Sequence, residues 1–186
     1  KSEATEAFAD MEWHVQPLSL DRFGEPLHKF DAITPSVCNL RPTSRGHVHI
    51  KSSDPNVAPA IQLNYLSTER DQRVAIAGIR RTREIMAAEN MRQFEPEEWK
   101  PGAHLQSDEE LLSAARDLGT TIFHPVGTCK MGSDSMAVVD DRLKVHGVDA
   151  LRVIDASIMP RITSGNTNAP TVMIAEKGAQ LVLNDN

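Results

Sequence analysis

The spacing of hydrophobic residues predicts two amphipathic helices in the middle of the chain. Between Ser67 and about Asn90, apolar positions recur at mostly helical spacing, with Ser67 or Thr68 available as N-cap and acidic residues in the first turn. Ser107 and Glu110 have the spacing of a capping box and precede a second apolar face. We therefore expect one long and one shorter helix, separated by a proline-containing loop.

Shorter apolar runs predict strands on both sides of these helices. Residues 1–35 mix apolar residues with turn formers, which is typical of short strands joined by loops. Residues 47–50 alternate in polarity as a half-buried strand does, and residues 151–154 read as a short buried strand that stops at Asp155. A last helix is predicted to open with Pro170 at its first position. The chain thus combines short strands with helices and shows no internal repeat.

Composition and charge narrow the classes of protein to consider. The 186 residues are 40% hydrophobic and 25% charged, which is ordinary for a globular chain of about one domain. No apolar run approaches the ~20 residues that span a bilayer, and the first thirty residues lack the features of a signal peptide. A net charge of −6, with scattered Lys and Arg, argues against nucleic-acid binding.

The cysteines bear on the cellular compartment of the protein, and the first residues on whether the chain is a fragment. Cys38 and Cys129 lie far apart and match no metal-ligand or redox spacing, so a reducing cytoplasm is expected, although a single disulfide is not excluded by the sequence. The chain starts at Lys1, and its first methionine is Met11, inside a segment expected to be structured. We therefore expect a fragment of a longer protein.

His124 is the first candidate for chemistry. It lies in residues 123–128 (FHPVGT), where an apolar lead-in and the following proline are expected to hold the imidazole rigidly at the end of a strand. A neutral imidazole is the natural general base near neutral pH. On this evidence alone a structural role remains the more common explanation for a single histidine.

Asn168 and the segment at Asp155 are the next candidates. Asn168 precedes the last predicted helix and can serve as its N-cap, but the same helix start also directs backbone N–H groups and a positive dipole end towards a developing anion. The strand that runs into Asp155 resembles the edge where α/β proteins receive nucleotide phosphates. No G-x-G-x-x-G occurs in the chain, so the nucleotide-binding half itself is missing.

Weaker candidates do not predict a further site. His47 and His49 project from one face of a strand but lack a third metal ligand at a suitable spacing. Cys129 and Met131 are soft ligands two residues apart, but a turn thiol and a core methionine are the simpler explanation. The G-x-S-x-G elbow of serine hydrolases is absent. We predict no metal site.

Taken together, several motifs resemble the C-terminal signature of the glucose-methanol-choline (GMC) oxidoreductase family, most closely its choline-dehydrogenase-like branch. The segments that carry this resemblance are residues 124–132 (HPVGTCKMG), 138–140 (VVD), 145–148 (VHGV), 151–160 (LRVIDASIMP) and 166–171 (NTNAPT). Residues 42–46 (PTSRG) and the helix around residues 78–85 are also similar to the family, so the likeness covers about residues 35–186.

The resemblance implies an α+β fold. Residues 1–125 are expected to belong to a substrate domain, a mainly antiparallel sheet with flanking helices, and residues 126–186 to return to the FAD domain as its C-terminal strand and helix. Members of the family carry the glycine-rich FAD fingerprint in an N-terminal part that this chain lacks. The active site is expected at the junction of the two domains.

The resemblance also implies roles for individual residues. His124 corresponds to the catalytic base that removes the alcohol proton while hydride passes to flavin N5, and Asn168 to a second catalytic position, occupied in the family by His or Asn, that hydrogen-bonds the alkoxide. Positions near the FAD phosphates and ribityl chain are Asp155 and Ala156, and those at the pyrimidine edge of the flavin are Ala169, Pro170 and Thr171.

The expected function follows from these roles. We expect an FAD-dependent oxidoreductase that acts on CH–OH groups of a small-molecule alcohol. The cofactor is expected in the full-length protein, whereas the 186-residue chain alone is expected to hold no FAD, to be inactive, and to associate with a second copy through its exposed junction surface. The alternative is a non-catalytic interaction module that retains the substrate-domain fold.

Overall fold

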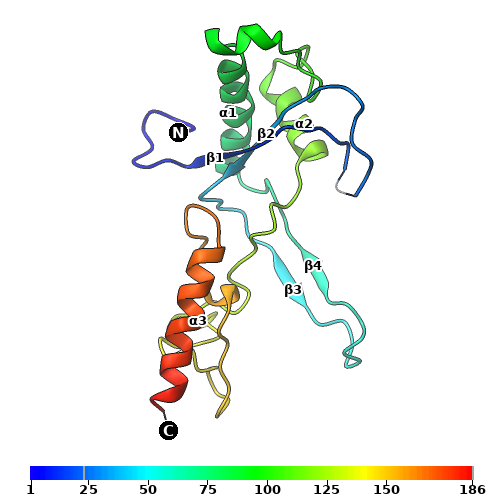
Figure 1. Ribbon diagram of the computed structural model, residues 1–186. Coiled ribbons are helices and arrows are strands. Elements are labelled where there is room, and N and C mark those ends of the chain that lie inside the picture. The colour runs from blue at the N-terminus through cyan, green and yellow to red at the C-terminus, as the bar shows by residue number, and fades with distance from the viewer. Residues whose placement is uncertain (23, 186) are drawn as a thin grey trace. The chain divides into compact units, whose positions relative to one another are not determined.

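The computed structural model describes residues 1–22 and 24–185, which form two compact units (Figure 1). Unit 1 joins residues 1–43 to residues 66–120, and unit 2 joins residues 44–65 to residues 121–185. Within the described part of the chain, no helix is both long and apolar enough to cross a membrane.

Unit 1 is a hairpin of two strands covered by helices. Its elements are β1 (Met11–Gln16), β2 (Thr34–Asn39), α1 (Glu69–Met86), the 3₁₀ helix η1 (Glu89–Phe94) and α2 (Asp108–Leu118). The two strands pair antiparallel, α1 packs on β2, and α2 packs on α1. The apolar faces predicted for the two helices therefore supply much of the core of this unit.

One face of the hairpin in unit 1 is fixed against α1. Trp13 and Val37 are paired across the strands, and Trp13 Nε1 donates a 2.8 Å hydrogen bond to Thr82 Oγ1 of α1. A Cβ atom on Gly78 would lie 2.9 Å from Val37 Cγ1, so the absence of a side chain lets the helix approach the strand closely. The other face of the hairpin points away from α1.

Local sequence signals set the starts of both helices in unit 1. The Thr68 side chain accepts a hydrogen bond from Asp71 N and caps α1, as predicted. Ser107 and Glu110 form the predicted capping box, and the backbone N–H of Ser107 is the first cause that lowers the pKa of Glu110. Each helix start therefore has a local side-chain cap, and the start of α1 is also held by a distant contact, because the Asp71 carboxylate accepts a 2.8 Å hydrogen bond from Thr43 N.

Unit 2 contains a second hairpin and the last helix. Its elements are β3 (His47–His49), β4 (Ala60–Gln62), the 3₁₀ helix η2 (Ala156–Ile158) and α3 (Asn168–Leu183). β3 and β4 pair antiparallel. The strand predicted at residues 47–50 is therefore present, as β3, and is one residue shorter. The buried core of this unit consists of Val139, Leu143, Ile158, Met159 and Ile174. The α+β class is thus confirmed, with small antiparallel sheets.

Two predictions about unit 2 need correction. Residues 151–154 form no regular strand; only Arg152 takes part in an isolated antiparallel bridge, with Lys144. The apolar run is held by side-chain packing instead, since Ile154 packs against Gly178 of α3. Furthermore, α3 begins at Asn168, so Pro170 is its third residue; the first turn tolerates proline there because its N–H groups have no intrahelical partner.

Candidate active site

The sequence predicted that His124 lies at the end of a strand. The structure instead places it in an irregular segment of unit 2. The preceding Phe123 has a φ of 64°, a left-handed conformation that is uncommon for a bulky residue. Its backbone N–H donates to Thr121 Oγ1 over 3.0 Å. This local hydrogen bond helps to hold the turn that presents the histidine.

The segment that follows His124 is anchored to η2 by backbone hydrogen bonds. Cys129 N donates to Ser157 O over 3.0 Å, and Met131 N donates to Ile158 O over 2.8 Å. Gly127 has a φ of 87°, and a Cβ atom there would lie 3.1 Å from Met159 O, so glycine meets both a conformational and a steric requirement. The loop that carries His124 is therefore tied to the segment of Asp155 and Ala156.

The His124 side chain contacts the start of α3. His124 Nδ1 lies 2.8 Å from Thr167 Oγ1, and Thr167 is only 8% exposed. When Nδ1 carries the ring proton, it donates to the threonine oxygen and leaves the lone pair of Nε2 available. The buried Thr167 hydroxyl, 43 positions further along the sequence, thus orients the imidazole of His124.

Thr167 was not among the site residues predicted from the sequence. The structure makes it the N-cap of α3, although its side chain bonds to His124 and forms no capping hydrogen bond. Asn168, which the sequence offered as N-cap, is instead the first helical residue and is exposed. The motif in residues 166–171 marked the correct segment, but a threonine beside an asparagine gives no sequence signal for which of the two faces the histidine.

The predicted cofactor positions lie on the two segments next to His124. Asp155 Oδ1 accepts a 2.8 Å hydrogen bond from Ser157 N and a second from Ser157 Oγ, so this carboxylate shapes the turn at η2. Asn168 and Ala169 are exposed in the first turn of α3, where backbone N–H groups lack intrahelical acceptors. Donors and a positive dipole end suit the electron-rich edge of a flavin, so the residues present fit FAD.

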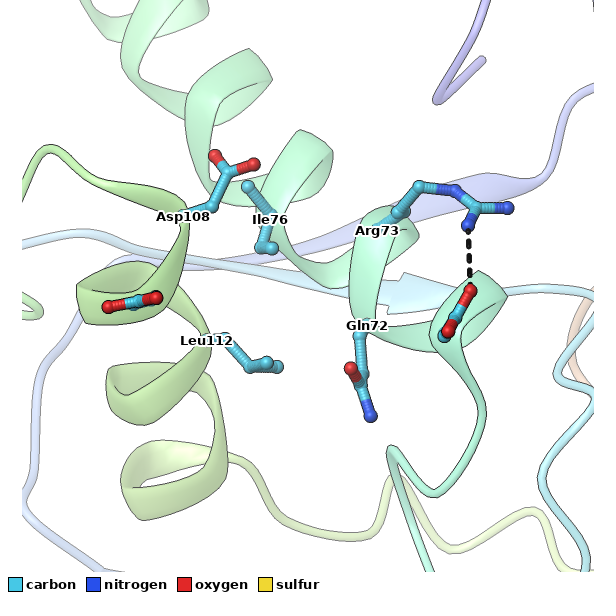
Figure 2. A pocket seen from close by; sticks show the side chains of 7 residues that line it. Gln72, Arg73, Ile76, Asp108 and Leu112 are labelled. Atoms are coloured by element: carbon cyan, nitrogen blue, oxygen red, sulfur yellow. Dashed lines mark ion pairs between the residues drawn. The ribbon is translucent and has the colours of Figure 1, made fainter.

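A separate groove lies in unit 1, between α1 and α2 (Figure 2). It has a volume of about 250 Å³. Ile76 and Leu112 form its apolar part, and the Arg73 guanidinium lies 3.8 Å from the Glu69 carboxylate at its edge. None of the predicted site residues lines this groove, so it is not the site indicated by the motifs.

Comparisons with known proteins agree with the motifs. The model of the GMC oxidoreductase family matches residues 42–175. An oxygen-dependent choline dehydrogenase of Proteus mirabilis is 45% identical over 176 residues, which cover 95% of this chain and 32% of that protein. The chain therefore spans about a third of the length of the curated relatives it matches.

Solved structures give the same picture. Pyridoxine 4-oxidase from Mesorbium loti matches 92% of this chain and 34% of its own chain, with a TM-score of 0.83 and 29% identity. An FAD-dependent oxidoreductase from Chaetomium thermophilum matches 80% of this chain and 26% of its own, with a TM-score of 0.76 and 36% identity. Most of the chain thus has a structural counterpart in known oxidoreductases.

Proposed function

Because the chain belongs to the GMC oxidoreductase family, we propose that the protein containing it is an FAD-dependent enzyme that oxidises the CH–OH group of an alcohol. The identity with oxygen-dependent choline dehydrogenases supports a small primary alcohol as substrate, and choline is the first compound to test. In this proposal, residues 1–125 contribute to a substrate domain and residues 126–186 return to the FAD domain. The two free cysteines, Cys38 and Cys129, favour a reducing cytoplasm.

His124 is the proposed general base. With its Nδ1 proton donated to Thr167 Oγ1, the ring can accept the hydroxyl proton of the alcohol at Nε2. The buried threonine limits rotation of the imidazole, so the base is oriented before the substrate arrives. The 2.8 Å contact between these two side chains is the observation that carries the proposal.

Asn168 is the proposed second group at the alcohol oxygen. It follows Thr167 directly and is exposed at the N-terminal end of α3, so its amide can donate a hydrogen bond to the oxygen as the proton leaves. The positive end of the helix favours the same developing negative charge. A neutral amide suits this role because it donates without competing for the proton.

FAD, when bound, supplies the acceptor for the hydride that leaves the carbon bearing the hydroxyl group. Asp155 and Ala156 are proposed to hold its phosphates and ribityl chain. The first turn of α3, with Ala169, Pro170 and Thr171, is proposed to face the pyrimidine edge of the flavin. The side chains of this turn are small, so its backbone can approach a planar ring closely.

The test of the proposal is to replace His124 by Ala in the complete, flavin-loaded enzyme. We expect turnover of choline or another primary alcohol to fall by about 10²–10⁴, the usual contribution of a positioned base, with flavin content unchanged. Asn168→Ala should also lower turnover, whereas His47→Ala, which removes an exposed histidine on β3, should leave it unchanged. Activity of the His124 variant within a few-fold of the unaltered enzyme would show that this residue is not the base.

A further inference from the structure

Three side chains with metal-binding chemistry lie together on the hairpin of unit 1. Glu12 on β1 is directly opposite Cys38 on β2, and His14 lies two residues beyond Glu12 on the same strand. Because side chains alternate between the faces of a strand, these three share one face. Trp13 and Val37 occupy the opposite face, against α1.

The distances between the potential ligand atoms suit a single ion. A carboxylate oxygen of Glu12, a ring nitrogen of His14 and the sulfur of Cys38 all lie within 4.8 Å of one another, and His14 Nε2 is 3.8 Å from Glu12 Oε1. Tetrahedral zinc, with bonds of about 2.0–2.3 Å, separates its ligand atoms by roughly 3.3–3.8 Å. Small side-chain rotations on a fixed hairpin therefore suffice to complete the geometry.

An unpartnered nitrogen in this cluster points towards a ligand. His14 Nε2 is buried and has no hydrogen-bond partner among the residues that the structure describes. An unsatisfied buried nitrogen is costly, and coordination would remove that cost.

We propose that Glu12, His14 and Cys38 bind one zinc ion, with a fourth coordination position left to water. The mixed oxygen, nitrogen and sulfur donors favour Zn²⁺ over Mg²⁺ and Ca²⁺, which prefer oxygen alone. On binding, the thiol proton passes to solvent and the sulfur bonds to the ion, without any change of oxidation state. The side chains of Glu12 and His14 are 34% and 31% exposed, so the ion has a path from solvent. This site shares no residue with the proposed alcohol oxidation.

The first test is a titration of the metal-free chain with Zn²⁺ by calorimetry. We expect one ion per chain, and binding at least about tenfold weaker in Cys38→Ala, His14→Ala and the isosteric Glu12→Gln. Cys129→Ala is the matched control, because it removes the other half-buried free cysteine and should leave binding unchanged. No one-to-one binding at micromolar zinc, or equal binding by the Cys38 variant, would overturn the proposal.

A second test uses the unaltered sequence and so does not depend on the folding of variants. Zn²⁺ should slow alkylation of Cys38 by iodoacetamide at least about tenfold, because a coordinated sulfur is a poor nucleophile, and should leave Cys129 unaffected. Mass spectrometry of the alkylated peptides distinguishes the two cysteines. Equal protection of both, or protection of neither, would contradict a site at Cys38.

Discussion

At the scale of single residues, the contact between His124 and Thr167 connects sequence motif to chemistry. The residues around His124 made it a candidate for chemistry, but the role of catalytic base came from the resemblance of residues 124–132 and the other motifs to the GMC family. Thr167 could not be predicted, since the two residues are 43 positions apart and meet only when the loop docks beside α3. Tertiary packing therefore decides which neighbour orients the ring.

This contact leads to a prediction for Thr167. Thr167→Val keeps the shape of the side chain but removes its hydroxyl, and a hydrogen bond has a net worth of about 0.5–1.5 kcal/mol. If that energy serves to orient the base, turnover by the flavin-loaded enzyme should fall roughly 2–13-fold. Thr167→Ser, which keeps a hydroxyl, should retain most of the turnover of the unaltered enzyme. Thr163→Val, at an exposed position, should leave turnover unchanged. A serine variant no better than the valine variant would show that the hydroxyl does not position His124.

At the scale of elements, local signals predicted helices better than strands. The caps at Thr68 and Ser107 lie within one turn of the helices they start, so these capping interactions can be predicted from the local sequence. The apolar run at residues 151–154 lacked such a signal, because a strand needs a partner with compatible register. Its side chains found their partners on α3 instead, which leaves the segment with an isolated bridge.

The contact between α3 and this segment makes Gly178 sensitive to substitution. In an exposed helix, Gly→Ala stabilises by about 1 kcal/mol. A Cβ atom on Gly178, however, would lie 2.3 Å from Ile154 Cγ2, and such overpacking typically costs about 1–3 kcal/mol. We therefore expect Gly178→Ala to lower the free energy of unfolding measured with denaturant. Adding Ile154→Ala should make the Gly178 substitution less harmful; equal costs in both backgrounds would exclude this clash.

The C-terminal end of α3 is held by a cluster of charges. Arg142, Lys144 and Arg152 all pair with Asp185, and hydrogen bonds from Lys144 and then Arg142 hold the pKa of this carboxyl well below its ordinary value. A lowered folded-state pKa stabilises the fold above the pKa of an unfolded Asp, and the contribution is lost as pH falls towards the folded value. The Arg142 and Lys144 side chains are 46% and 47% exposed, so salt should screen their pairs with Asp185.

Asp185→Asn should therefore reduce the loss of folding stability as the pH falls. Between about pH 5 and pH 2 the unaltered chain should lose more stability than the variant, because only the former has this carboxylate to protonate. Thermal unfolding across this range measures the difference. The exposed Asp149→Asn, which removes the same charge outside the cluster, is the control. Parallel pH profiles for the Asp185 variant and the unaltered chain would show that the cluster does not stabilise the fold.

At the scale of the whole molecule, several apolar side chains next to the candidate-site residues in the sequence are exposed. Phe123 is 65% exposed, and Val172 and Met173 are exposed in the first turns of α3. Such side chains next to a proposed base and cofactor edge suit a surface that another part of the enzyme covers. A second copy of the chain can compete for the same surface, which makes self-association a property to monitor in any binding experiment.

The last prediction concerns FAD and the 186-residue chain by itself. The residues proposed to contact the cofactor come from η2 and the first turn of α3, while no G-x-G-x-x-G is available to hold a pyrophosphate. Binding must overcome the loss of translational and rotational freedom, and so few contacts leave little surplus. Flavin fluorescence should therefore show no saturation at micromolar FAD, and an assay with choline and an artificial electron acceptor should show no turnover. Saturable micromolar binding or measurable turnover would mean that these two segments hold the cofactor without the glycine-rich turn.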